Sequence, residues 1–391
     1  MGELRLSRPL HGGNLAWAAT IAGCPASLIL DFSASINPLG PPKSAITAIQ
    51  GNLESIKTYP NPHYSQLRSS LSEWHQLPSE WILPGNGSAE LFTWAGWELA
   101  PQSATCLVTP AFSDYERALK AFNANVCRCP LLLEEVEGRK AGGAGGAGEV
   151  GEAGEELYLT PGLEDSPLPL SPPPLCASAP LPSKGLLLNN PHNPSGKLFP
   201  RREILPYLEE FSLVVVDEAF MDFLPPQQQQ SLISLVQDYP NLVILRSLTK
   251  FYSLPGLRLG YAIAHPDRLQ RWQNWRDPWP VNTLAAAAGE AVIKDTDFQK
   301  QTRDWLIPAR SQLFQGLAAL PGLQPLESAA NFLLVRTEQP SSQLQEKLLQ
   351  HNHILIRDCL SFPELGDRYF RVAVRSHTDN QRLLEGFAAI I

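Results

Sequence analysis

Apolar and polar residues follow one another along the chain in a pattern that predicts strands and helices in turn. Runs of consecutive apolar residues closed by turns are typical of buried strands, and mixed stretches with apolar residues at helical spacing are typical of helices. Strands that alternate with helices favour an α/β fold on an open sheet. Strands are predicted at 81–84, 105–109, 184–188, 211–217, 242–246 and 259–264, and helices at 15–22, 44–50, 64–75, 91–99, 113–122 and 201–210.

From residue 282 onward the pattern changes to longer helices mixed with short strands. Such a mix predicts a small α+β domain packed beside the sheet. We therefore predict an N-terminal arm that begins the small domain (1–50), a large domain (51–281) and a small C-terminal domain (282–391). In the last part, helices are predicted at 282–294, 298–320, 343–350 and 380–390, and strands at 331–335, 354–357 and 369–374.

Residues 138–183 break the pattern of elements. A Gly/Ala/Glu run (138–154) is followed by a stretch rich in Pro, Ser and Leu (161–182). Such a composition buries little apolar surface, so we predict a largely disordered surface insertion between two strands. An interdomain linker is the alternative, but the strand pattern resumes directly at 184–188.

Composition and charge narrow the class of protein. The 391 residues suffice for a large core, and a net charge of −8 argues against nucleic acid as a partner. No apolar run is long enough to cross a membrane, and the N-terminus lacks a signal pattern. Cys127 and Cys129 form a C-x-C pair, which by itself is weak evidence for a metal site. We expect reduced thiols, a cytoplasmic location and no metal ion.

The segment 247–258 carries the chemistry from which we predict the activity. It places Ser247, Lys250 and Arg258 on a loop just past a predicted strand, where open α/β sheets bind ligands. A hydroxyl and a guanidinium beside an amine suit a carbonyl compound that bears a phosphate. Pyridoxal 5'-phosphate (PLP) needs a lysine Schiff base and phosphate anchors of this kind. In the alternative, Lys250 is a solvated loop residue and Arg258 a surface charge.

Two further strand ends point to the same ligand. The turn at 85–90 opens a helix, and free N–H groups at Ser88 and Ala89 would form an anion site there. Asp217 closes a buried strand, which is costly without a partner. The cationic partner that we predict is the protonated pyridine nitrogen of PLP. A plain helix cap at 85–90 and a local salt bridge at Asp217 are the alternatives.

Other polar and aromatic residues leave two interpretations open. Phe112 follows a strand and could stack on a planar ring or fill the core. Tyr59 lies in a rigid proline-bearing loop that could be a simple surface turn. Arg357 and Arg371 lie in apolar strands, where arginine needs an anionic partner, either a protein carboxylate or a substrate.

Together the motifs at 85–90, 193–196, 217–220 and 247–258 resemble those of fold-type-I PLP enzymes of the aminotransferase superfamily, classes I and II. The resemblance covers nearly the whole chain apart from 138–183. It implies a three-layer α/β fold with a mostly parallel sheet and a smaller α+β domain. The stretches 11–14 with 31–40, 217–223 and 246–261 are most similar to the threonine-phosphate decarboxylases of cobalamin biosynthesis. The histidinol-phosphate aminotransferases come next, although they more often have tyrosine where Phe220 stands.

The resemblance implies a role for each candidate residue. Lys250 would form the Schiff base, Asp217 would hold the pyridinium, Asn193 would bond the ring oxygen and Phe112 would stack on the ring. The residues implied for the cofactor phosphate are Ser88, Ala89, Ser247 and Arg258, with Tyr59 reaching it from the partner subunit of a homodimer. The residues implied for the substrate are Arg357 and Arg371, which would hold its anionic groups, and His11 and Asn14, which would cover it.

The implied activity is the decarboxylation of L-threonine O-3-phosphate, with a small phosphorylated amino acid or amino alcohol as the substrate. The first alternative is transamination of histidinol phosphate with 2-oxoglutarate, which uses the same cofactor site. The second is a non-catalytic PLP-binding regulatory module, which the presence of both Lys250 and Asp217 disfavours.

Overall fold

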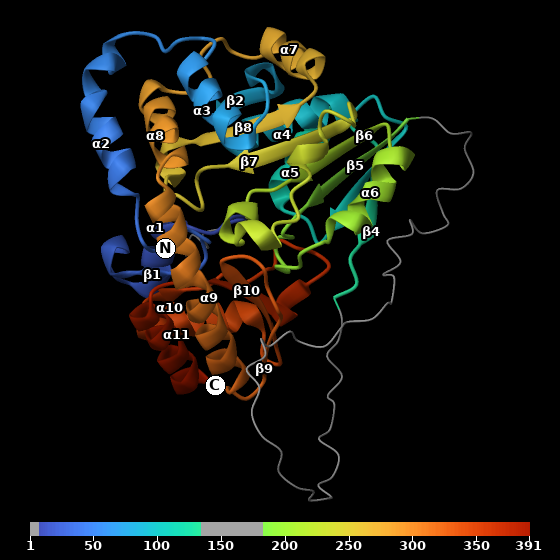
Figure 1. The fold of residues 1–391 in the computed structure, drawn as a ribbon. Coiled ribbons are helices and arrows are strands. Elements are labelled where there is room, and N and C mark those ends of the chain that lie inside the picture. Colours follow the sequence, from blue (N-terminus) through green and yellow to red (C-terminus); the bar gives the residue numbers. More distant parts are fainter. Residues whose placement is uncertain (1–7, 134–182) are drawn as a thin grey trace, which may run out of the picture.

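The computed structural model describes residues 8–133 and 183–391. The insertion predicted at 138–183 lies outside the described residues except for its last position. The parts that are described form a seven-stranded sheet, a three-stranded sheet and a separate pair of short strands, with helices packed around them (Figure 1).

The larger sheet has seven strands in the order β2-β8-β7-β6-β5-β3-β4. Strand β8 runs antiparallel to both of its neighbours, and the remaining pairs are parallel. The carboxyl ends of β3, β5, β6 and β7 therefore meet at one edge of the sheet, where doubly wound folds bind ligands. The strands are β2 (Ile82–Asn86), β3 (Ala104–Thr109), β4 (Val126–Pro130), β5 (Lys184–Asn189), β6 (Leu213–Asp217), β7 (Leu242–Ser247) and β8 (Leu259–Ala264).

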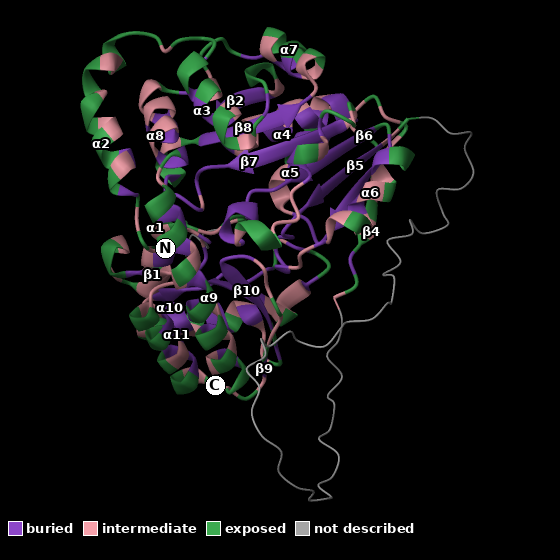
Figure 2. Cartoon of the chain, viewed as in Figure 1, coloured by how far each residue is buried: buried purple, intermediate pink, exposed green. Residues whose placement is uncertain are grey.

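Helices cover both faces of this sheet because the central strands are apolar on both sides. Alternate residues point to opposite faces, so Leu186 and Leu188 pack on one face and Leu187 on the other. Figure 2 shows the central strands as buried and the outer sides of the helices as exposed. On one face lie α3 (Ser65–His75), α6 (Arg201–Glu210) and α8 (Thr283–Ile293), and on the other lie α4 (Gly87–Leu99), α5 (Ser113–Ala121) and α7 (Pro266–Trp275).

The smaller sheet is antiparallel, in the order β12-β10-β9. Strand β1 (Leu30–Asp31) pairs separately with β11 (Ile354–Leu355), which brings the N-terminal segment beside the C-terminal one. The elements in this half are β9 (Leu323–Pro325), β10 (Phe332–Thr337), β12 (Tyr369–Ala373), α1 (Leu15–Ala22), α9 (Thr296–Ala318), α10 (Ser341–Asn352) and α11 (His377–Ile390). Helix α2 (Lys43–Gly51) packs on α8 instead, beside the larger sheet (Figure 1). The domain boundaries at 50 and 281 stay a prediction.

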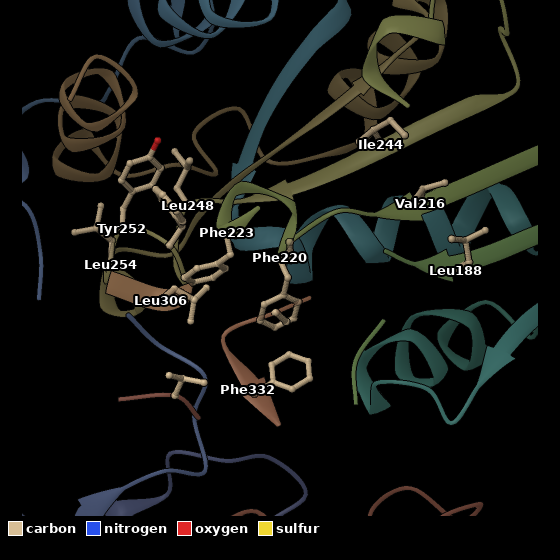
Figure 3. Packing of buried hydrophobic residues seen from close by; sticks show 14 of the residues in the cluster. Leu188, Val216, Phe220, Phe223, Ile244, Leu248, Tyr252, Leu254, Leu306 and Phe332 are labelled. Carbon is tan, nitrogen blue, oxygen red and sulfur yellow. The ribbon is translucent and has the colours of Figure 1, made fainter. Parts of the chain in front are cut away.

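One hydrophobic cluster runs from the larger sheet into the smaller one. Phe220, which follows β6, meets Phe332 of β10 edge to face with ring centroids 5.0 Å apart, and Figure 3 shows the two rings pointing toward each other. Each fully buried ring stabilises the fold by about 1.5–3 kcal/mol. This contact joins the larger sheet to the smaller one through two buried rings.

The α/β fold class predicted from the pattern is confirmed, and the predicted strands and helices are present with ends shifted by a few residues. Besides the two-residue strand β1 (Leu30–Asp31), three strands or helices were not predicted. Strand β4 alternates exposed and half-buried residues at the sheet edge, α7 is largely polar and opens with Pro266, and β9 is three residues long. None of the three carries the continuous apolar run on which the other predictions depended.

Candidate active site

A cavity of about 460 Å³ lies where the carboxyl edge of the larger sheet meets the N- and C-terminal segments. This volume falls in the range of small-molecule sites. Most of the residues predicted for the site line it: His11, Ser88, Ala89, Phe112, Asn193, Asp217, Lys250, Arg258, Arg357 and Arg371.

Lys250 lies in the turn after β7, so its amine reaches the cavity from the sheet edge. Burial lowers the pKa of Lys250 to about 8, and the positive charges of Arg371 and Arg258 act in the same direction against the opposing effect of Asp217. The amine lies 5.7 Å from the centroid of the Phe220 ring. A lysine with such a pKa is partly neutral near physiological pH and is therefore a competent nucleophile.

Asp217 ends β6 and is buried on the floor of the same cavity. One carboxylate oxygen accepts a hydrogen bond from the backbone N–H of Ala219 at 2.9 Å, and the other accepts one from the hydroxyl of Tyr115. Burial raises the pKa of Asp217, while these hydrogen bonds and the charge of Lys250 oppose the rise. Burying this carboxylate therefore costs free energy, which a cation close by would offset.

The N-terminus of α4 forms an anion-binding corner with Arg258. Gly87 has a φ of +72°, and a Cβ there would lie 2.4 Å from Nη2 of Arg258. A Cβ at Gly260 would lie 2.8 Å from the backbone nitrogen of Ser88. Glycine at both positions lets the guanidinium and the helix N–H groups converge on one point, which suits a phosphate.

The structure places Ser247 behind this corner rather than on the cavity. Its buried hydroxyl lies 2.7 Å from the hydroxyl of Thr249, and it is Thr249 that lines the cavity. Thr249 was missed in the sequence because a threonine between Ser247 and Lys250 has no signal of its own. Ser247 therefore orients Thr249 in this structure.

Aromatic and amide groups form the walls. Phe112, just after β3, contacts Tyr115 edge to face at 5.6 Å between centroids and the His11 ring at 5.5 Å. The side-chain oxygen of Asn193 accepts a hydrogen bond from Arg371. The amide nitrogen of Asn193 remains as a donor for an oxygen in the cavity.

Arg357 and Arg371 lie opposite each other as an isolated antiparallel bridge, and both are buried. The Nη2 of Arg371 donates to the backbone oxygen of Ser33 at 3.2 Å, but its buried Nε has no partner among the described residues. Burial lowers the pKa of Arg371 to about 10, with Arg357 adding to the effect. The nearest carboxylate to Arg357 is that of Asp358, at 3.9 Å from Nη1. Two adjacent guanidiniums with so little negative charge beside them are suited to an anionic ligand.

Besides Ser247, two predicted site residues do not line the cavity. The side chain of Asn14 caps α1 by accepting a hydrogen bond from the backbone of Trp17 at 3.0 Å. Tyr59 is 77% exposed and stacks on Trp279 at 4.3 Å between centroids, in a separate hollow. Neither touches the cavity of its own chain.

The geometry of these residues fits PLP. An amine and a carboxylate face one cavity, an anion corner is kept open by Gly87, and the buried Nε of Arg371 lacks a partner among the described residues. The donor set thus matches an aldehyde, a pyridine nitrogen, a phosphate and an anionic substrate.

Comparisons with known proteins show which family and which solved folds the chain is similar to. Residues 28–390 match the family model "Aminotransferase class I and II". The chain is 38% identical to a threonine-phosphate decarboxylase of Salmonella typhimurium, over 99% of this chain and 98% of that protein. Its fold is similar to the L-threonine-O-3-phosphate decarboxylase of Porphyromonas gingivalis (TM-score 0.73, 23% identity, 92% of this chain and 98% of that one). It is also similar to a histidinol-phosphate aminotransferase of Sinorhizobium meliloti in complex with PLP (TM-score 0.77, 20% identity, 100% and 99%).

Proposed function

Because the chain belongs to the class I and II aminotransferases, a PLP-dependent family, we propose that it decarboxylates L-threonine O-3-phosphate. The product would be (R)-1-aminopropan-2-yl phosphate, an intermediate for cobalamin biosynthesis. Similarity over the full length to a threonine-phosphate decarboxylase supports this choice. The observation that carries it is the adjacent pair Arg357 and Arg371, because the substrate has two anionic groups, a phosphate and a carboxylate.

Different residues would hold different parts of the cofactor. PLP, when bound, supplies an electron sink for negative charge that develops at the substrate α-carbon. Lys250 would hold it covalently, Asp217 would keep its ring nitrogen protonated, and Asn193 would donate to its ring oxygen. Its phosphate would lie against the N–H groups that begin α4 and against Arg258.

Arg357 and Arg371 would decide which bond at the α-carbon breaks. They can hold both anionic groups of the substrate, so the orientation of the carboxylate is fixed before reaction. Lys250, whose pKa is lowered to about 8, would return a proton to the α-carbon once carbon dioxide has left. An aminotransferase needs the same lysine to remove a proton from that carbon instead. The orientation of the substrate therefore separates the two activities.

A direct assay tests the proposal. The purified protein is incubated with PLP and L-threonine O-3-phosphate, and carbon dioxide is measured. Release of carbon dioxide, absent from a Lys250→Ala variant, is the expected result. If instead no carbon dioxide forms and histidinol phosphate with 2-oxoglutarate yields glutamate, the transaminase alternative replaces the proposal. A protein that binds PLP but turns over neither substrate would be the regulatory module.

We further propose a cytoplasmic homodimer in which Tyr59 of each chain reaches the cofactor phosphate of the partner. The exposure of Tyr59 and its distance from the cavity of its own chain support this arrangement. The cysteines among residues 8–133 and 183–391 are free thiols, which is the usual state in a reducing compartment. No helix in the described part of the chain is long and apolar enough to cross a membrane.

Mixing two inactive variants tests the shared site. Lys250→Ala and Tyr59→Ala chains are co-expressed with different tags, and the mixed dimer is isolated. If Tyr59 acts across the interface, one site of the mixed dimer carries both defects and the other is intact, so activity returns to about half per dimer. Mixed dimers without activity, or a monomer by light scattering, would contradict it.

A further inference from the structure

A cluster of three thiols lies on the edge of the larger sheet, away from the cavity. Cys106 belongs to β3, and Cys127 and Cys129 belong to the edge strand β4. Their sulfur atoms all lie within 4.8 Å of one another. None of these residues lines the candidate active site.

The pairing of the two strands explains why the three sulfurs meet. Cys106 is directly opposite Cys127 in the parallel ladder, and Cys129 is opposite Val108. Residues two apart on a strand point to the same face, so all three thiols lie on the face that α6 covers. Cys106 is buried, whereas Cys127 and Cys129 are half-buried, which leaves a path from solvent to the cluster.

The thiols also interact with one another chemically. A hydrogen bond with Cys129 lowers the pKa of Cys106 to about 7, and Lys184 and Cys127 add smaller effects in the same direction. Cys129 holds its proton more firmly for the same reason, because its pKa is raised by the bond to Cys106. Cysteines bind metals as thiolates, so three thiols at one place offer a cation a set of soft ligands.

We propose that Cys106, Cys127 and Cys129 bind one soft, thiophilic metal cation through their three sulfur atoms. A cation with metal–sulfur bonds of about 2.3 Å needs sulfurs about 4.0 Å apart, so sulfurs that lie within 4.8 Å of one another need at most a small contraction. The group contains no histidine, aspartate or glutamate. A site made of sulfur alone selects soft cations and rejects magnesium and calcium.

The position of the cluster indicates what binding would do. The cation would cross-link β4 to β3 and so fix the outermost strand of the sheet. Binding to the folded state alone raises thermal stability. Since the cluster lies outside the cavity, the metal would not enter the proposed reaction, and the inference does not depend on that reaction.

Cadmium is a suitable probe because its bonds to thiolates absorb in the ultraviolet. The reduced full-length protein with PLP bound is titrated with cadmium chloride and, separately, with magnesium chloride. A thiolate-to-metal absorbance band that saturates at one cadmium per chain, with a rise in melting temperature, is expected for cadmium. No band is expected for magnesium. Cadmium should also protect these three cysteines from alkylation, as read by peptide mass spectrometry.

Single variants identify the ligands. Cys127→Ser and Cys129→Ser, on the edge strand, should lose the band, as should Cys106→Ser if it folds. Cys24→Ser is the matched control, because Cys24 is also half-buried but lies outside the cluster, and it should keep the band. The proposal is overturned if the wild-type protein shows no band, or if the band survives in both edge-strand variants. It is equally overturned if cadmium leaves the three cysteines open to alkylation.

Discussion

The hydroxyl of Tyr115 donates a hydrogen bond to the carboxylate of Asp217, across 102 positions of sequence. Both side chains are buried, Tyr115 on α5 and Asp217 at the end of β6. The tyrosine stays protonated because burial and the negative charge of Asp217 raise its pKa. It thus acts as a fixed donor that favours the ionised form of the acid.

Replacing Tyr115 by phenylalanine should weaken cofactor binding. A hydrogen bond to a charged group contributes about 1.5–3 kcal/mol, so PLP affinity should fall by roughly 10- to 100-fold. The pKa of Asp217, already raised by burial, would rise further. When the solution is acidified, the variant should therefore lose its cofactor at a higher pH than the wild-type protein does. Equilibrium dialysis from pH 8 down to pH 5 measures both effects. Tyr261→Phe, which removes a buried hydroxyl that contacts His75, should leave PLP affinity unchanged.

Asp217→Asn should stabilise the protein without cofactor while it abolishes turnover. The folded-state pKa of Asp217 is raised, so folding stability is lost as pH rises from the unfolded value through the folded one. The variant apoprotein should therefore melt at a higher temperature than wild type at pH 7, and the difference should vanish at low pH. Turnover should fall by at least about a hundredfold, as for loss of one preorganised charge. An apoprotein that melts lower at pH 7 would refute this account.

The pKa of Lys250 should govern how fast the apoprotein captures PLP. The neutral amine is the nucleophile, and its fraction grows as pH passes through about 8. The rate of covalent capture, followed by absorbance, should rise from pH 6 and level off above that value. A rise that continues toward pH 10.5, the ordinary pKa of lysine, would contradict the prediction. Lys250→Ala should bind PLP without covalent capture at any pH.

Gly87→Ala should damage the anion corner. The new Cβ would lie 2.4 Å from Nη2 of Arg258, so the guanidinium has to move. PLP affinity should fall by at least tenfold, or about 1.4 kcal/mol. Gly23→Ala is the matched control, since Gly23 also has a positive φ (+64°) but open space around it. It should cost about 1 kcal/mol of stability and nothing in PLP affinity.

Arg371→Gln should raise the KM for L-threonine O-3-phosphate. Loss of one charge-assisted contact corresponds to about 1.5–3 kcal/mol, or roughly 10- to 100-fold. The side-chain amide can still donate to Ser33, so folding should be preserved. Circular dichroism and steady-state kinetics check the two statements. Arg382→Gln, on the exposed side of α11, is the control, and equal KM values for the two variants would remove Arg371 from the substrate site.

The elements and residues that were predicted correctly are those marked by one continuous run of the sequence. The strand at 259–264 was predicted with the ends that β8 has, because six apolar or small residues are closed by turns. Lys250 and Asp217 were predicted to share one cavity because both follow strands of one parallel sheet, and they do. Strand β4 was missed since half of its residues face solvent.

Residues whose importance comes from a distant partner could not be predicted. Tyr115 follows Phe112 by one helical turn, but nothing near it in the sequence indicates Asp217. Asn14 lies close to His11 in the chain, yet it caps α1 because the helix begins at the next residue. Tyr59 lies outside the cavity of its own chain, and its role in a partner's site stays a prediction.

The hydrogen bond from Arg371 to Asn193 crosses from the smaller sheet to the loop after β5. In the proposed site the guanidinium serves the substrate and the amide serves the cofactor. An anion that binds Arg371 therefore alters the Asn193 amide that faces PLP. By linkage, PLP changes the affinity for that anion by the same free energy. The two ligands should bind cooperatively, so an unreactive phosphate-bearing substrate analogue should slow the loss of cofactor during dialysis.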